Sequence, residues 1–229
     1  MPQAIVFDFD GVIADTEPLH HRALADVFEP MGLSLSYEQY LEELVGYDDR
    51  DLIRICWRRV APGRGEVTDA QMRTLIDRKA EAFEAVVERG LTAVPGVLDF
   101  VPRAAAALPI AIASGATRRD IDLILRKLGL APHFSAIVTA DDVERSKPDP
   151  ETYARAVRLL AAARPAMGLE PAHCLAIEDT DAGITSARGA GLLTLGLTTT
   201  GDAASVARAH RVATDFRSLS LDMLQQWFG

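Results

Sequence analysis

The stretch that decides the fold is Ile5-Val6-Phe7-Asp8-Phe9-Asp10-Gly11-Val12, near the start of the chain. Its first residues are β-branched and aromatic, which predicts a short buried strand. Asp8 and Asp10 follow at the point where this strand ends, and Gly11 allows the chain to turn. Ligands of open parallel sheets bind at the carboxyl ends of strands. Two carboxylates this close are costly unless a cation lies between them or one stays protonated, so the stretch predicts either a binding site or an ordinary Asp-Gly turn.

The composition limits the classes of protein to consider. With 229 residues and 48% hydrophobic content, the chain can form one good core and a small additional domain. The net charge of −9 argues against nucleic acid or an anionic membrane as the main partner, although a local cationic pocket could still bind a small phosphorylated ligand. We expect a monomer or a weak homo-oligomer.

The cysteines and the N-terminus predict where the protein resides. Cys56 and Cys174 are far apart in the sequence, which predicts two reduced, partly buried thiols rather than a zinc site. Met1-Pro2-Gln3 leads directly into the first strand, without a basic segment or a long apolar run. We therefore expect a soluble cytoplasmic protein with no signal peptide and no membrane-spanning segment.

Strand and helix patterns alternate through most of the chain, which predicts a parallel sheet covered on both faces. The expected strands are 5–7, 110–113, 136–138, 174–177, 193–195 and 211–213, and the expected helices are 97–107, 117–129, 151–163, 181–190, 203–209 and 218–227. The interval between residues 13 and 92 breaks the alternation, because only helical patterns occur there, near 18–31, 37–45, 49–60 and 69–89. We expect an α/β fold with a doubly wound parallel sheet formed by residues 1–15 and 92–229, and an inserted helical domain, 16–91.

Polar residues follow three further strands of the expected sheet. Ser114-Gly115-Ala116-Thr117 offers an anion a hydroxyl, close backbone approach and helix-terminal N–H groups, although taken alone this motif is better explained as a plain turn with Thr117 as N-cap. In Ser146-Lys147-Pro148-Asp149-Pro150 the proline keeps Lys147 extended, and Asp149 and Pro150 are expected as N-cap and first position of the next helix. Glu178 and Asp179 form a second acidic pair suited to Mg²⁺, or cap the following helix.

Two acids, a hydroxyl, a lysine and two more acids thus occur in this order at successive strand ends. The ordered set resembles the haloacid dehalogenase-like superfamily over essentially the whole chain, which implies a Rossmann-like core. The inserted segment is similar to the small α-helical cap of the branch that contains phosphoglycolate phosphatases and β-phosphoglucomutases.

The resemblance implies a role for each motif. Asp8 would be the nucleophile that forms an aspartyl-phosphate, and Asp10 the general acid and base. Ser114 and Lys147 would hold phosphoryl oxygens. Mg²⁺ would be held by Asp8, the backbone carbonyl of Asp10 and Asp179, with Glu178 binding directly or through water. Dehalogenases and phosphonatases of this superfamily lack the second aspartate, so Asp10 indicates phosphate-ester chemistry.

The helical insertion supplies candidates for substrate binding. Thr16 is a plausible N-cap and hinge, and Glu17 and His20, three residues apart, share one helix face. The two positions are similar to polar positions that face the active site in related sugar-phosphate enzymes. The alternative is a solvated glutamate and a partly buried histidine. Gly46 belongs to a loop expected to reach the substrate, with Gly115 and Ala116 contributing from the core. Arg50 could clamp a second anionic group or pair with a neighbouring acid on the surface, and Lys79 is a weaker candidate.

We therefore expect a Mg²⁺-dependent phosphatase of a small phosphorylated metabolite, such as a sugar phosphate or a phosphoglycolate-like acid. A phosphomutase is the first alternative, but similar β-phosphoglucomutases carry a lysine where this sequence has Val45. A non-catalytic sugar-phosphate sensor is the second alternative, although a sensor has little need for both Asp8 and Asp10.

Overall fold

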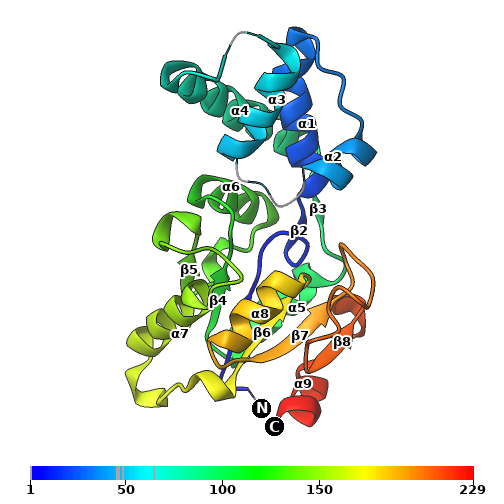
Figure 1. Ribbon diagram of the computed structural model, residues 1–229. Helices are drawn as coiled ribbons and strands as arrows, with labels where there is room; N and C mark the ends of the chain where they lie inside the picture. The colour runs from blue at the N-terminus through cyan, green and yellow to red at the C-terminus, as the bar shows by residue number, and fades with distance from the viewer. Residues whose placement is uncertain (1, 45–46, 48, 64) are drawn as a thin grey trace. The chain divides into compact units, whose positions relative to one another are not determined.

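The structure is a computed structural model that describes residues 2–44, 47, 49–63 and 65–229. The chain divides into two compact units (Figure 1). Residues Met1–Asp15 and Thr92–Gly229 form the first, which we call the core unit, and Thr16–Leu91 form the second, the cap unit. The predicted Gly46 lies outside the described residues.

The core unit contains a six-stranded parallel sheet with the strand order β5-β4-β1-β6-β7-β8, which confirms the predicted fold. The strands are β1 (Ala4–Phe7), β4 (Ile110–Ala113), β5 (Ala136–Val138), β6 (Cys174–Glu178), β7 (Leu193–Leu197) and β8 (Arg211–Ala213). Strand β1 lies in the middle, and all four of its residues are fully buried. Because Phe7 is in register with Ile112 of β4 and Ile177 of β6, the residues after these strands emerge side by side.

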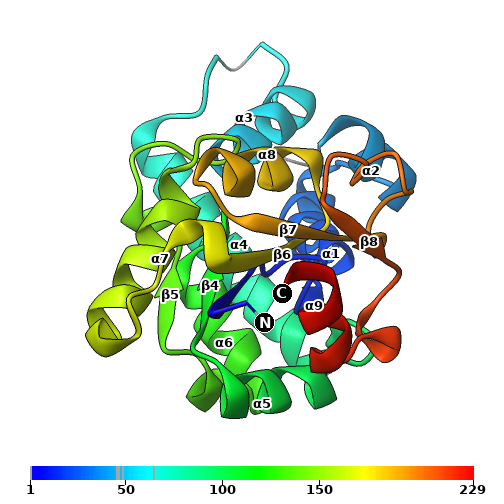
Figure 2. The ribbon, with the colours of Figure 1, turned by 90° about the horizontal axis from the view of Figure 1, so that it is seen from below.

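Helices cover both faces of the sheet, as predicted (Figure 2). The helices are α5 (Val97–Ala107), α6 (Arg118–Leu128), α7 (Glu151–Ala163), α8 (Asp181–Gly189) and α9 (Leu221–Phe228). Val6 packs in one buried cluster with Tyr153 of α7 and Ala187 of α8. On the opposite face, the Phe7 ring contacts Phe100 of α5. The alternation of side chains along β1 therefore supplies the cores of both layers.

The structure corrects three expectations for the core unit. Residues 203–209 are turns rather than a helix. The sequence analysis missed a two-stranded antiparallel ribbon formed by β2 (Ala14–Asp15) and β3 (Thr92–Ala93). This ribbon pairs the two segments of the core unit where the chain leaves for the insertion and returns from it. Helix α7 begins at Glu151, as the helical pattern predicted, but Pro150 rather than Asp149 occupies the N-cap position, and Asp149 accepts a hydrogen bond from the Glu151 N–H.

The cap unit consists of α1 (Glu17–Phe28), α2 (Tyr37–Glu43), α3 (Asp49–Val60) and α4 (Asp69–Arg89). Its core includes Phe28, Ile53, Trp57 and Leu75. A short 3₁₀ turn, Glu29–Met31, follows α1 within the cap unit, and those of the core unit cover Ala131–His133, Ala140–Asp142, Pro165–Met167, Pro171–His173 and Phe216–Ser218.

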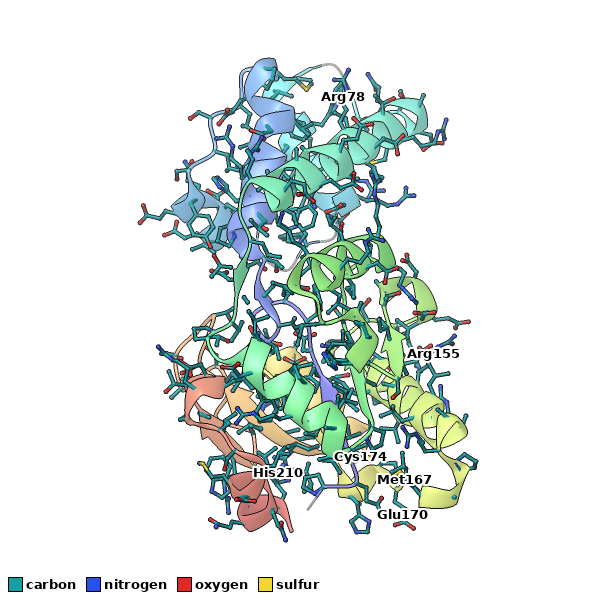
Figure 3. All side chains as sticks on the ribbon, turned by 180° about the vertical axis from the view of Figure 1, so that it is seen from behind. Arg78, Arg155, Met167, Glu170, Cys174 and His210 are labelled. Atoms are coloured by element: carbon teal, nitrogen blue, oxygen red, sulfur yellow. The ribbon has the colours of Figure 1, made fainter. Side chains whose placement is uncertain are left out.

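Both cysteines are free and buried, and Cys174, labelled in Figure 3, opens β6. Among the described residues, no helix has both the length and the apolar character needed to cross a bilayer.

Candidate active site

Side chains from three distant parts of the sequence meet at the carboxyl edge of the sheet. Asp8 follows β1 and Glu178 ends the neighbouring strand β6, so the sheet itself places the two carboxylates together. Lys147 lies in the turn before α7, directly before the cis peptide bond to Pro148, and its ammonium donates to both acids. The distances from Nζ to Asp8 Oδ1 and to Glu178 Oε1 are both 2.6 Å. The three side chains form a charge cluster almost closed to solvent.

Glu178 is the most completely bonded member of this cluster. Its Oε1 accepts from Lys147 and from the Tyr153 hydroxyl, the latter at 3.0 Å. Its Oε2 accepts from the backbone N–H of Asp179 and from the backbone N–H and hydroxyl of Thr180, at 3.0 to 3.1 Å. With five donors on two oxygens, Glu178 is suited to fixing the site or to meeting a metal ion through water, rather than to direct ligation.

Two residues explain how a carboxylate can be buried at this point. Gly183, in the first turn of α8, leaves room for it, because a Cβ there would lie 1.7 Å from Glu178 Oε1. Tyr153 lies beneath the cluster, with its ring centroid 5.0 Å from Lys147 Nζ. Burial, together with the neighbouring Glu178 charge, raises the pKa of Tyr153, so its hydroxyl remains a donor.

The pKa values of two acids, Asp8 and Asp179, are shifted toward the protonated form when no cation other than Lys147 is near. Burial and the Glu178 charge raise the pKa of Asp8 well above its usual range, although Lys147 opposes them. The same two causes raise the pKa of Asp179 to about 7. Burial alone would lower the pKa of Lys147, but the charges of Asp8 and Glu178 outweigh it and raise that pKa. The cluster therefore carries excess negative charge that a divalent cation can offset.

The arrangement fits a hard divalent cation. Asp8, Glu178 and Asp179 each offer a carboxylate oxygen, and these oxygens lie within 4.8 Å of one another. Asp179 Oδ1 is buried and accepts no hydrogen bond within the described part of the chain. A buried carboxylate oxygen without a partner is costly, and a metal ion would satisfy it. An all-oxygen donor set of this kind suits Mg²⁺.

Asp10 is half-buried in the turn that follows Asp8. The turn is closed by the Gly11 N–H, which donates to the Ala14 carbonyl at 2.8 Å, and by the Ile13 N–H, which donates to Phe9 at the same distance. Gly11 has a φ of +71°, and a Cβ there would come 2.1 Å from Asp179 Oδ2. Glycine is thus required both by the turn and by the close approach of the second acidic loop.

Ser114 and its neighbours, in the loop after β4, form a further part of the site at the carboxyl edge of the sheet. The Ser114 side chain is buried, and its Oγ accepts from the Ala116 N–H at 2.9 Å, which leaves the hydroxyl proton available to an anion. A Cβ on Gly115 would meet open space. Thr117 is the N-cap of α6, where its hydroxyl accepts from the Asp120 N–H at 3.3 Å. The turn and anion-binding interpretations are therefore compatible.

In the cap unit, His20, Lys79 and Asp49 form a polar cluster, and Glu17 is hydrogen-bonded to Tyr40. Thr16 is buried at the start of α1, but its side chain does not cap the helix. Glu17 accepts from the Tyr40 hydroxyl at 2.8 Å. The His20 ring stacks on Phe83, with the ring centroids 4.5 Å apart.

Lys79 is the buried cation of this cluster. It forms an ion pair with Asp49, and its Nζ lies 3.2 Å from His20 Nδ1. Burial and the Lys79 charge lower the pKa of His20 well below its usual range. Arg50 is exposed and forms no ion pair with another described residue, so the predicted surface pairing is not observed there.

Two residues of the core site were missed by the sequence analysis. One is Tyr153, which contacts both Lys147 and Glu178, and the other is Thr200, whose hydroxyl donates to Asp179 Oδ2. Thr200 follows strand β7, so the rule that strand ends carry site residues could have identified it. Tyr153 lies inside a helix, where a buried tyrosine normally indicates core packing.

Comparisons with known proteins agree with this geometry. The sequence matches the family model described as haloacid dehalogenase-like hydrolase over residues 5–197. The chain belongs to this family. It is 34% identical over 197 residues to protein CbbY of Rhodobacter capsulatus, covering 83% of this chain and 82% of that protein. It is 32% identical over 194 residues to the fructose-1-phosphate phosphatase YqaB of Escherichia coli, covering 82% of this chain and 92% of that protein.

A solved structure extends the likeness to the fold. The structure of CbbY from Rhodobacter sphaeroides in complex with phosphate matches with a TM-score of 0.79 and 28% identity, covering 98% of this chain and 100% of that one. Family membership and the fold are thus established over almost the whole length.

Proposed function

We propose that this protein is a Mg²⁺-dependent phosphatase that hydrolyses a small phosphorylated metabolite through an aspartyl-phosphate on Asp8. The observation that carries the proposal is the buried charge cluster, in which Asp8 is held 2.6 Å from Lys147 Nζ, beside Asp179 Oδ1, which has no hydrogen-bond partner among the described residues. An ordinary structural ion pair does not need this excess of buried acid. Family membership supports the same chemistry.

Asp8 acts as the nucleophile in the first step. Its Oδ attacks phosphorus, the bond from phosphorus to the ester oxygen breaks, and Asp10 gives its proton to the departing alkoxide. In the second step Asp10 takes a proton from water, the water oxygen bonds to phosphorus, and the acyl-phosphate bond to Asp8 breaks. Inorganic phosphate leaves and Asp8 is restored as a carboxylate.

The remaining residues position the reacting groups and offset their negative charge. Lys147 orients Asp8 through its 2.6 Å hydrogen bond and offsets the negative charge that accumulates when an anionic nucleophile meets a phosphate ester. The Ser114 hydroxyl donates to a phosphoryl oxygen. Asp8, the Asp10 carbonyl and Asp179 would hold Mg²⁺, with Glu178 beyond a water molecule. The ion supplies charge stabilisation for the phosphoryl oxygens when it is bound.

A small phosphorylated metabolite, and a sugar phosphate in particular, is the proposed substrate class. The name of the E. coli relative, a fructose-1-phosphate phosphatase, supports this class. The net charge of −9 disfavours nucleic acid as a substrate. Glu17, His20 and Arg50 of the cap unit remain predicted substrate-binding residues.

The test is phosphate release from a panel of sugar phosphates, phosphoglycolate and p-nitrophenyl phosphate, with and without Mg²⁺. We expect turnover only with the metal, and none from Asp8→Asn. The phosphomutase alternative predicts conversion of β-glucose 1-phosphate to the 6-phosphate that depends on a bisphosphate activator. Turnover that is equal in EDTA, or that persists in Asp8→Asn, would contradict the proposal.

A further inference from the structure

The two carboxylate oxygens of Asp179 have different surroundings. Oδ2 accepts a hydrogen bond from the hydroxyl of Thr200, whereas Oδ1 is buried and has no hydrogen-bond partner among the described residues. Asp179 itself is only 2% exposed. One oxygen is therefore occupied by a protein donor and the other is left for a ligand.

The segment that carries Thr200 is held to the core unit on both sides of the hydroxyl. The neighbouring Thr199 hydroxyl donates to the Gly11 carbonyl at 2.5 Å, which joins the segment to the turn after Asp8. A Cβ at Gly11 would lie 2.1 Å from Asp179 Oδ2, so only glycine at this position leaves room for that oxygen. Oδ2 is thus enclosed by the two loops that flank it.

Farther along the segment, Arg208 forms a two-pronged ion pair with Asp181 at the start of α8, with 2.6 Å from Nε to Oδ1. Beyond it, His210 accepts from the Thr194 backbone N–H at 3.0 Å through Nδ1. Figure 3 labels His210 on the core unit beside β8. These contacts join the far end of the segment to the core unit, while the hydrogen bonds of Thr199 and Thr200 hold its near end.

We propose that Thr200 is a positioning residue that makes Asp179 a ligand through Oδ1 alone, and that it thereby favours Mg²⁺ over Ca²⁺. Mg²⁺ requires nearly ideal octahedral geometry with short bonds to single oxygens, whereas Ca²⁺ accepts six to eight ligands and bidentate carboxylates. A hydroxyl that occupies Oδ2 disfavours bidentate binding. The inference rests on the proposed Mg²⁺-dependent function and adds a determinant of metal choice to it.

The test measures metal binding to the resting protein, without substrate. Mn²⁺ binding is followed by electron paramagnetic resonance, and Mg²⁺ and Ca²⁺ are titrated as competitors. The variants are Thr200→Val, which removes the hydroxyl at constant shape, and Thr200→Ser, which keeps it. Ser205→Ala is the matched control, because Ser205 lies in the same segment and bonds Asp202 rather than Asp179.

Loss of an outer partner of a metal ligand typically lowers affinity about 10- to 100-fold. We expect Thr200→Val to lose roughly 10-fold or more in Mg²⁺ affinity and less in Ca²⁺ affinity, so that the Mg²⁺/Ca²⁺ affinity ratio falls. Thr200→Ser and Ser205→Ala should keep the wild-type ratio. Thr200→Ala gives a second hydroxyl-free variant should the valine variant fail to fold.

An unchanged ratio in a folded, hydroxyl-free variant would overturn the inference, and so would an equal loss of affinity for both ions. Either result leaves the proposed function standing, since wild-type protein would still bind Mg²⁺. Failure of the wild-type protein to bind Mn²⁺ or Mg²⁺ at all would instead overturn the proposed function and this inference together.

Discussion

Replacing Lys147 by methionine should strongly destabilise the metal-free core unit. The methionine retains most of the length and apolar contacts of the lysine stem but removes the ammonium that Asp8 and Glu178 share. Their side chains are 9% and 0% exposed, so water cannot replace the lost donor. The substitution leaves three buried acids, these two and Asp179, with no cation among them.

The magnitude follows from the burial of the pair. Removing one partner of a buried ion pair costs about 3–5 kcal/mol, a large part of a typical free energy of unfolding of about 5–15 kcal/mol. Burial already raises the pKa of Asp8 and of Asp179, so the folded variant can bind protons to relieve the repulsion. Because the folded state then holds more protons than the unfolded state, stability rises as the pH falls. We expect Lys147→Met to lose the full amount, about 3–5 kcal/mol of unfolding free energy, near pH 8 and less near pH 5.

The assay is urea unfolding in EDTA at these two pH values. The chain has two tryptophans, Trp57 in α3 of the cap unit and Trp227 in α9 of the core unit. In a Trp57→Phe background the remaining fluorescence reports the core unit alone. Arg126→Met, at an exposed position in α6, is the control, and its stability should change by less than about 0.5 kcal/mol.

Two results would refute this reasoning. The first is equal stability of the Lys147→Met and Arg126→Met variants at pH 8. The second is a loss in Lys147→Met that is as large at pH 5 as at pH 8, which would show that the buried acids are not the source of the destabilisation.

Three further predictions concern other parts of the molecule. Asp10→Ala should lower kcat/KM about 10²- to 10⁴-fold for alkyl phosphates but far less for p-nitrophenyl phosphate, whose leaving group needs no proton; equal losses would contradict an acid role. Gly183→Ala should lower the free energy of unfolding in urea by about 1–3 kcal/mol, because the added Cβ would lie 1.7 Å from a Glu178 oxygen. The control Gly90→Ala places its Cβ in open space and should not lower this free energy. The lowered pKa of His20 implies stability that is present above about pH 6.5 and is lost as the pH falls further; thermal melts should show this loss in wild type and not in His20→Gln.

The core of the site was predictable because a parallel sheet converts chain order into proximity. Each strand ends at the same edge, so residues placed directly after strands must meet there, as Asp8 and Glu178 do. Lys147 was harder to place, since it lies in a turn, but the prolines around it indicated a fixed direction. These signals are local in the sequence.

What the sequence analysis missed depends on contacts between distant residues. Tyr153 is one of many apolar-face residues of α7, and only its packing beneath Lys147 and Glu178 distinguishes it. The alanine-rich stretch 203–209 has helical propensity, and Asp202 Oδ1 accepts from the N–H groups of Ala204 and Ser205 as an N-cap does, yet the stretch forms only turns. A stretch of seven residues is too short for propensity alone to form a helix.

The central claim is that Asp8 carries the phosphoryl group, and trapping that group tests it most directly. Wild-type enzyme turning over a phosphorylated substrate is quenched rapidly in acid, and its peptides are analysed by mass spectrometry. The account predicts phosphate on the peptide that contains Asp8, formed at least as fast as product is released. Turnover without phosphate on Asp8, or with the phosphoryl group on another residue, would contradict it.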